Sequence, residues 1–305
     1  MKKFLKYIAQ LLLLILIILE VLLRMINLAA HTLPTENVNG NYLLKPGSDS
    51  VWVRGGIGEI KNHYHINSTG WNSIIDYEQV PVSKLSVAIV GDSYIQGMQT
   101  DVEYSIGRLL EKKMADIHPL VVHEYGRGGG NIVDFKLLYK DKLKNNYDYV
   151  FILITDEDIV QRKPSFMNRG ERNRPKTTFR KIYDRIYILR YLNINHGLGT
   201  KVADLLGNGP DSIERIHHRK DKDSLDMNNV NFEAVSEIDD SVIYLHENGK
   251  LDSRFINSLS NKTVLIEHHI LPKDHGFDGH WNKNGRLNCA NSIKKFIIKD
   301  LENNH

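Results

Sequence analysis

The chain has 305 residues, of which 41% are hydrophobic and 25% are charged. This length and composition allow the chain to bury its own core, so folding requires neither a metal nor a disulfide. One globular domain with additional segments is expected. The formal net charge of +3 gives no support for a nucleic-acid partner, and the single cysteine, Cys289, excludes an intramolecular disulfide.

Residues 1–30 begin with basic residues and continue as a strongly apolar segment. Lysines at positions 2, 3 and 6 precede the run from Ile8 to Leu23, which is mainly Leu and Ile. As a helix, the stretch from Phe4 to Leu28 is long enough to cross a hydrocarbon core of about 30 Å. The sequence gives no reason for Glu20 inside this run, beyond its closeness to one end and hence to the membrane interface.

Three interpretations of this segment remain open: a signal anchor, a cleaved signal peptide ending near Leu28-Ala29-Ala30, and a buried core helix. We favour the anchor, because a signal peptide's apolar region usually has about 7 to 15 residues and a core helix would show a polar face. The basic start favours a cytoplasmic N-terminus. The expected location is therefore the cell membrane, with a single pass and with the chain after Arg24 on the extracytoplasmic side.

Residues 31–83 are predicted to form a stalk with accessory strands. Gly, Pro, Asn and Ser recur there at short intervals, and pieces such as Val51–Val53 and His63–Ile66 lie between them. This pattern is typical of loops that join short strands.

Residues 84–301 are predicted to form an α/β domain with a parallel sheet. Leu85–Val90 is a short apolar run that ends at Gly91, as a buried parallel strand would. Strands alternate with helices, which places helices on both faces of the sheet. The remaining expected strands are Leu120–His123, Tyr149–Ile154 and Thr263–Ile266, and the expected helices are Ile106–Met114, Ile132–Leu143 and Gly285–Leu301.

The regular alternation is interrupted between about 161 and 239. This segment is rich in Arg, Lys, Asn and Asp, with amphipathic pieces at Ile182–Leu192 and Val202–Leu206. It is interpreted as a partly helical insertion or lid, or else as a solvated surface excursion, because basic runs usually mark exposed faces.

Gly91-Asp92-Ser93-Tyr94 stands where the first strand of the domain ends and a helix begins. A serine there can project its hydroxyl above the carboxyl edge of the sheet, where ligands of open α/β sheets bind. The alternative is that Asp92 or Ser93 only caps the helix.

A second group of residues, Asp278 and His280, precedes the last helix. A serine hydroxyl is a weak nucleophile, so it needs an imidazole to take its proton and a carboxylate to hold that imidazole. An Asp-x-His loop can supply both groups, although it could also be a surface loop with a helix cap.

These motifs resemble those of the SGNH (GDSL-type) hydrolase family. Ile89–Tyr94 with Gly97 is similar to the first block of the family, and Asp278–Asn282 with Gly285 is similar to its last block. The resemblance covers roughly Lys84 to Leu301 without the insertion. It implies a three-layer α/β/α flavodoxin-like domain that hydrolyses or transfers acyl esters.

The resemblance also implies roles for individual residues. Ser93 would be the nucleophile, His280 the general base and acid, and Asp278 the orienting carboxylate. The glycine run from Tyr125 to Asn131 lies where the family has an oxyanion glycine, and Gly129 is its best match, one residue before Gly130. A glycine run could instead be a tight turn.

The third family block differs in this chain. The family usually has Asn followed by Asp after the third strand, whereas Thr155-Asp156-Glu157-Asp158 occurs here. An ionised Glu157 would repel an oxyanion, so it must be turned away or protonated, or another donor must complete the oxyanion hole. Asn131 is our candidate for that donor, because it directly follows the glycine run.

Four histidines lie close together with two aspartates near the C-terminus, and metal ligation by this cluster is conceivable. The spacing matches no zinc pattern, and His280 needs a free imidazole for its implied role. No metal and no cofactor are therefore predicted. The cluster consists of His268, His269, Asp274, His275, Asp278 and His280.

An exported domain tethered by one helix would meet substrates of the cell envelope. The first functional expectation is a serine esterase acting on O-acyl esters, chiefly O-acetyl esters, of envelope carbohydrate. Tethered proteins resembling this chain, with a segment like Ile66–Trp71, suggest extracellular polysaccharide modification. The alternatives are an O-acyltransferase with the same triad, a lipid esterase, and a non-catalytic envelope-binding protein, which Glu157 would favour. The oligomeric state is left open.

Overall fold

The computed structural model describes residues 2–29, 33–38, 40–77, 83–167, 178–199, 201, 227–260, 262–266 and 278–303. The chain divides into two compact units. We call the first the helical unit, which comprises Met1–Thr32, Val51–Lys61 and Asn173–Lys222. We call the second the α/β unit, which comprises Leu33–Ser50, Asn62–Arg172 and Asp223–His305.

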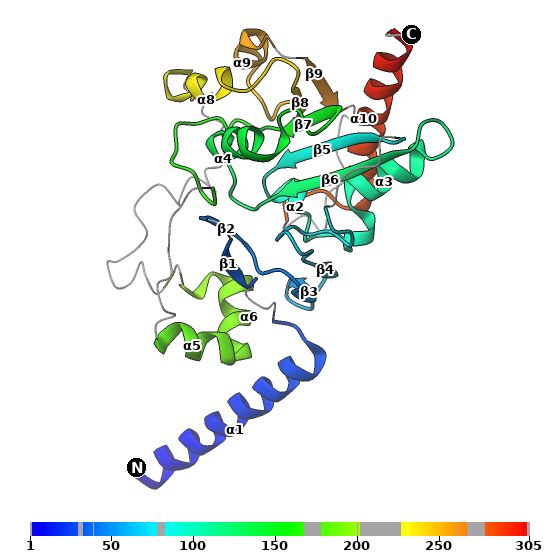
Figure 1. Ribbon diagram of the computed structural model, residues 1–305. Coiled ribbons are helices and arrows are strands. Elements are labelled where there is room, and N and C mark those ends of the chain that lie inside the picture. The colour runs from blue at the N-terminus through cyan, green and yellow to red at the C-terminus, as the bar shows by residue number, and fades with distance from the viewer. Residues whose placement is uncertain are drawn as a thin grey trace. The chain divides into compact units, whose positions relative to one another are not determined.

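Within its described residues, the α/β unit is built on a five-stranded parallel sheet with the order β6-β5-β7-β8-β9 (Figure 1). In sequence terms this is the order 2-1-3-4-5 of flavodoxin-like sheets, whose switch point lies between the first and third strands. A site is therefore expected where β5 and β7 end. The strands are β5 (Leu85–Gly91), β6 (Leu120–Gly126), β7 (Tyr149–Leu153), β8 (Ile243–Glu247) and β9 (Thr263–Ile266).

Helices cover both faces of the sheet. Apolar side chains of α3 (Ile106–Met114) and α10 (Lys283–Asn303) share one core with alternate residues of β5. Side chains of α4 (Ile132–Leu138) and α8 (Phe232–Ser236) share a second core with the other residues of that strand. The predicted three-layer α/β/α fold with a parallel sheet is thus confirmed.

Helix α3 shows how the sequence determines a local element. Ile106, Leu110 and Met114 recur every four residues, so they share one face of a helix, and all three are buried. The Ser105 hydroxyl accepts a hydrogen bond from the Arg108 N–H at the N-terminus of this helix. Two lysines lie in its last turn, where their positive charges interact favourably with the negative end of the helix dipole.

Most expected elements occur close to their predicted positions. β9 has the predicted bounds, whereas β5 and β6 extend as far as Gly91 and Gly126, and α4 continues as the π-helical turn η2 (Tyr139–Leu143). β8 was not predicted. The remaining elements of this unit are β1 (Thr35–Val38) and β2 (Asn41–Leu44), which pair antiparallel, together with α2 (Ser93–Gln96), η1 (Val102–Tyr104), η4 (Met227–Asn229) and α9 (Ser253–Ser258). β3 (Asp49–Arg54) and β4 (Ile60–His65) form another two-stranded sheet.

The helical unit contains α1 (Lys2–Ile26), α5 (Thr178–Arg185) and α6 (Tyr187–His196). α1 is long and apolar enough to cross a membrane, a property shared by signal anchors and signal sequences. The Glu20 carboxylate, unexplained by the sequence, accepts hydrogen bonds from the backbone N–H groups of Tyr187 and Ile188. Glu20 therefore caps the start of α6.

Candidate active site

The serine of the first motif is the first residue of α2, directly beyond the end of β5. Asp92 is the N-cap of this short helix, and its Oδ1 accepts a hydrogen bond of 2.9 Å from the Tyr94 N–H. The capping interpretation thus holds for Asp92. The Ser93 hydroxyl has a different partner, since it lies 2.8 Å from His280 Nε2.

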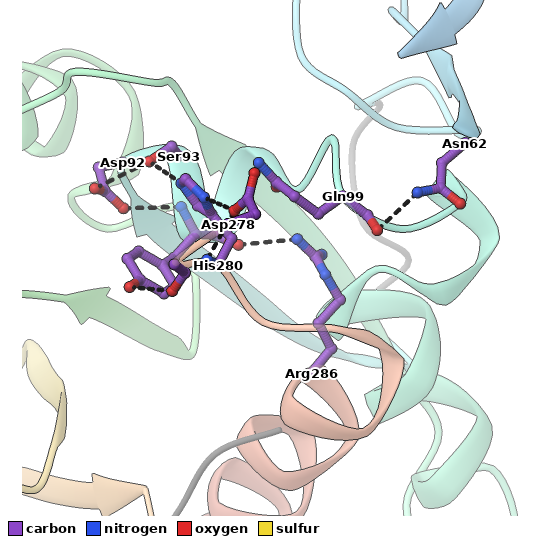
Figure 2. A network of polar contacts seen from close by, with 9 residues as sticks. Asn62, Asp92, Ser93, Gln99, Asp278, His280 and Arg286 are labelled. Carbon is purple, nitrogen blue, oxygen red and sulfur yellow. Dashed lines mark hydrogen bonds and ion pairs between the residues drawn. The ribbon is translucent and has the colours of Figure 1, made fainter. Parts of the chain in front are cut away.

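Ser93, His280 and Asp278 form a continuous hydrogen-bonded chain (Figure 2). His280 Nδ1 lies 2.5 Å from Asp278 Oδ1, and the same oxygen accepts the backbone N–H of His280 at 2.9 Å. Only 1% of the Asp278 side chain is exposed, compared with 22% of the His280 side chain. The structure thus brings together the three predicted catalytic residues, with the carboxylate buried and the imidazole reachable by a substrate.

A second carboxyl group, that of Asp92, lies near the serine, and Asp158 interacts electrostatically with Asp92. Asp92 Oδ2 is 3.3 Å from Ser93 Oγ, and burial raises the pKa of the Asp92 carboxyl. Burial also raises the pKa of Asp158 well above its usual range, and the neighbouring Asp92 charge raises it further. Both shifts make these buried carboxyls harder to ionise, and an additional negative charge near Ser93 would oppose an oxyanion.

The glycine run after β6 forms a tight turn beside the serine. The Gly130 N–H donates to the Arg127 carbonyl at 2.9 Å, and a Cβ built on Gly128 would lie 3.7 Å from Ser93 Cβ. Gly129 has a φ of 75°, and a Cβ there would meet nothing within 4 Å. In the part of the chain that the structure describes, the Gly129 N–H has no hydrogen-bond partner, so it is a candidate oxyanion donor.

The structure uses Asn131 as a helix cap. Its Oδ1 accepts hydrogen bonds from the N–H groups of Val133 and Asp134, and its Nδ2 donates to the Lys163 carbonyl at 3.0 Å. The side chain is buried. The amide oxygen thus caps α4 and the amide nitrogen binds the segment that contains Lys163. We therefore do not include Asn131 in the proposed oxyanion hole.

The turn after β7 has three acidic residues, and two of them, Glu157 and Asp158, differ in their exposure. Glu157 is exposed, whereas Asp158 is buried and accepts hydrogen bonds of 2.9 Å from the Thr155 N–H and hydroxyl. Because Glu157 is exposed, solvent screens its charge, which weakens the repulsion that an ionised Glu157 would exert on an oxyanion.

Sequence reasoning missed the residues that brace this arrangement. The Tyr94 hydroxyl donates to the Gly279 carbonyl at 2.8 Å, and its ring lies 4.9 Å from the His280 ring, centroid to centroid. Arg286 Nη2 donates to the Tyr94 carbonyl at 3.0 Å (Figure 2). Tyr94 therefore links the nucleophile helix to the Asp-x-His loop. Its position directly after Ser93 was the only signal for this role.

Residues before β5 also support the nucleophile helix. Asn72 Nδ2 donates to the Gln96 carbonyl at 2.8 Å. Asn62 Nδ2 donates to the Gln99 carbonyl at 2.7 Å (Figure 2). The accessory segment that precedes the domain thus fixes the chain on both sides of Gly97.

Among the described residues, no group of three or more His, Cys, Asp or Glu side chains could hold a metal ion. Four members of the predicted histidine cluster, His268, His269, Asp274 and His275, lie outside the described residues.

No protein-family model and no curated protein sequence matches the chain. Solved structures with a similar fold include a two-domain esterase active on acetylated mannans. Its sequence is 15% identical to this chain and the TM-score is 0.36, and the alignment covers 71% of this chain and 49% of the esterase. This chain therefore spans about half the length of that esterase. A putative lipolytic protein of the G-D-S-L family from Desulfitobacterium hafniense is 12% identical with a TM-score of 0.34, covering 70% of this chain and 99% of that one.

A carbohydrate esterase family 2 enzyme with a carbohydrate-binding domain, from Corynascus thermopiles (Myceliophthora fergusii), is 13% identical with a TM-score of 0.36, covering 74% of this chain and 69% of that one. The similar solved structures are thus GDSL-type and carbohydrate esterases. These identities and TM-scores are too low to carry the named activities over to this chain.

Proposed function

We propose that this chain is a serine esterase of the SGNH type, with Ser93 as nucleophile, His280 as general base and acid, and Asp278 as orienting carboxylate. The observation that carries the proposal is the hydrogen-bonded chain from Asp278 through His280 to Ser93. A buried carboxylate on Nδ1 fixes the imidazole tautomer in which Nε2 can accept the serine proton.

Each proposed step uses a group in this arrangement. Ser93 Oγ attacks the acyl carbonyl while His280 takes the hydroxyl proton, and the N–H groups of Ser93 and Gly129 face the developing oxyanion. The intermediate then collapses to an acyl-serine, and His280 donates its proton to the departing alcohol. Water, activated by the same imidazole, attacks the acyl-serine and releases the acid.

We further propose that α1 stays attached as a single membrane anchor and that the catalytic domain lies on the extracytoplasmic side. The contacts of Glu20 support retention, because cleavage near Ala30 would remove the acceptor of the first N–H groups of α6. Lys61 Nζ also donates to the Ile26 carbonyl at 3.2 Å. A helix that other segments of the mature chain bind is better suited to an anchor than to a removed signal.

From this location we propose O-acyl esters of cell-envelope carbohydrate, with acetyl as the acyl group, as substrates. The acyl-serine could also pass its acyl group to a sugar hydroxyl, which would make the protein an O-acyltransferase. Acetate release from acetylated mannan, xylan and peptidoglycan, measured with and without sugar acceptors, distinguishes hydrolysis from transfer.

The test of the proposed chemistry is p-nitrophenyl acetate turnover by the full chain in detergent. Ser93→Ala should lower kcat on the order of 10⁴-fold or more, the scale for losing a triad nucleophile. Ser236→Ala, which removes an exposed hydroxyl from α8, is the matched control and should keep full turnover. No turnover by the unmodified chain, and no acyl-serine detected by mass spectrometry, would favour an envelope-binding protein instead.

A further inference from the structure

The helical unit contains a carboxylate that joins the apolar helix to the inserted segment. Glu20 lies six residues before the end of α1, which corresponds to roughly 9 Å along a helix. Its two oxygens each accept one backbone N–H, from Tyr187 and from Ile188, both at 3.0 Å. Ile186, the N-cap of α6, offers no side-chain cap, so Glu20 supplies the acceptors that the helix start needs.

Arg24 balances the charge of this carboxylate. Its Nε donates to Glu20 Oε1 at 2.8 Å, its Nη2 donates to the Arg185 carbonyl at 2.5 Å, and its guanidinium lies 4.6 Å from the centroid of the Tyr187 ring. Charged side chains within a membrane-spanning helix are costly unless paired. The pairing allows Glu20 and the first turn of α6 to occupy the same depth in a bilayer.

The surfaces of α1 and α5 share one chemical character. Leu19 and Leu22 of α1 are 41% and 48% exposed, and Ile182 of α5 is 48% exposed. Three tyrosines lie on α5 and α6, and Arg185 lies in the last turn of α5. Tyrosine and arginine are typical of the boundary between acyl chains and headgroups. Exposed apolar side chains thus occur both on the anchor helix and on α5, together with residue types typical of the membrane interface.

We propose that α5 and α6 form an interfacial collar around the outer end of α1, and that the partner of its exposed surface is the phospholipid bilayer. Glu20 acts as the attachment point that sets the depth of the collar. This inference rests on the proposed anchoring of α1. It assigns part of the 161–239 insertion to the membrane rather than to a lid or a solvated excursion.

The test places a nitroxide label on α5 in the full chain, reconstituted in vesicles of phosphatidylcholine and phosphatidylglycerol. The labelled variant is Ile182→Cys, and its matched control is Ile117→Cys, which replaces an isoleucine that is 54% exposed in the α/β unit. Cys289 is buried, and burial raises the pKa of its thiol, so it reacts slowly with the label. Collision rates with oxygen and with a water-soluble nickel complex report the surroundings of each label.

We expect the Ile182→Cys label to be at least about threefold less accessible to nickel than the Ile117→Cys label, and more accessible to oxygen. Adding Glu20→Leu should raise the nickel accessibility of the Ile182→Cys label towards that of the control. Equal nickel accessibility of the two labels in a chain that floats with vesicles would overturn the collar while leaving the anchor intact. A chain that does not float with vesicles would overturn both, whereas turnover of p-nitrophenyl acetate tests the proposed chemistry separately.

Discussion

At the scale of single residues, the carboxyl groups of Asp278 and Asp92 make different contacts. Asp278 accepts both the ring N–H and the backbone N–H of His280, whereas Asp92 caps the Tyr94 N–H and lies 3.3 Å from Ser93 Oγ. Only the first arrangement fixes the imidazole tautomer. The contacts therefore assign the orienting role to Asp278 and a structural role to Asp92.

This assignment predicts unequal effects of replacing the two carboxyl groups by amides. Asp278→Asn should lower kcat for p-nitrophenyl acetate on the order of 10⁴-fold, because an amide favours the wrong tautomer of His280. Asp92→Asn keeps an oxygen for the Tyr94 N–H and should cost less than about 10-fold, since it loses only one weak contact. The opposite order of the two kcat values would assign the orienting role to Asp92.

Tyr94 is the other residue whose contacts bear on catalysis. Its hydroxyl donates to the carbonyl of Gly279, which lies between the proposed carboxylate and imidazole. Burial, followed by the surrounding carboxylates Glu247, Asp92, Asp278 and Glu157, raises the pKa of this phenol, so it remains a neutral donor. Tyr94 is thus a positioning residue for the Asp-x-His loop.

Tyr94→Phe should lower kcat about 3- to 10-fold with little change in KM, because one hydrogen bond of about 1 kcal/mol that orients His280 is lost. Tyr149→Phe is the matched control, since it removes a hydroxyl bound to Asp300 and should leave kcat unchanged. Kinetics with p-nitrophenyl acetate and thermal melting of both variants check the prediction. A loss confined to thermal stability would show that Tyr94 only supports folding.

At the scale of elements, the nucleophile helix is held by a glycine and an arginine that are far apart in sequence. Gly97 ends α2 with a φ of 67°, and a side chain there would overlap the guanidinium of Arg286, which is buried. Arg286 belongs to α10 and donates to the Tyr94 carbonyl. The close approach of α10 to α2 therefore requires glycine at position 97.

Gly97→Ala and Gly249→Ala separate the two reasons for a glycine. Both have positive φ values, 67° and 71°, which cost an alanine about 1–2 kcal/mol, but a Cβ at Gly249 would meet nothing within 4 Å. The overlap with Arg286 should make Gly97→Ala at least about 2 kcal/mol more destabilising than Gly249→Ala. Urea unfolding of both variants measures the difference, and equal midpoints would contradict the steric argument.

The elements also show which parts of the structure could be predicted from sequence. Runs such as Leu85–Gly91 are buried on both faces, so a continuous apolar pattern identifies them as strands. β8 was missed because it ends in His246 and Glu247, which are polar yet buried. Glu247 Oε1 accepts a hydrogen bond from Trp281 Nε1 at 2.9 Å, and this partner is distant in sequence.

The candidate site divides in the same way. Ser93, Asp278 and His280 stand in short motifs with chemical meaning, so the sequence could propose them before their distances were known. The roles of Tyr94 and Arg286 depend on contacts between segments nearly 200 residues apart, with separations of 185 and 192 residues, which no local pattern reveals. An asparagine directly after a glycine run can be either an oxyanion donor or the N-cap of the following helix. In the structure Asn131 forms a capping box with Asp134, so its side chain serves as the N-cap.

At the scale of the whole molecule, the two compact units carry different parts of the proposed function. Every residue assigned here to catalysis or positioning belongs to the α/β unit, whereas Glu20, Arg24 and α6 belong to the helical unit. The contacts that join α1 to the chain are also within the helical unit, including the hydrogen bond from Lys61 to Ile26. Chemistry and attachment should therefore be separable by experiment.

Deleting residues 1–29 provides that separation. The α/β unit keeps its own core and all contacts of Ser93 and His280, so turnover of p-nitrophenyl acetate should stay within about threefold of the full chain. The deletion removes the Glu20 oxygens that accept the first N–H groups of α6 and the Arg24 donor of the Arg185 carbonyl. The start of α6 should then open more often, so trypsin should cleave after Arg185 faster than in the full chain. Glu20→Leu in the full chain is the matched control, because it should accelerate the same cleavage while α1 remains present. Loss of turnover on deletion would mean that attachment and chemistry are coupled. Tryptic cleavage as slow as in the full chain would mean that Glu20 does not hold α6.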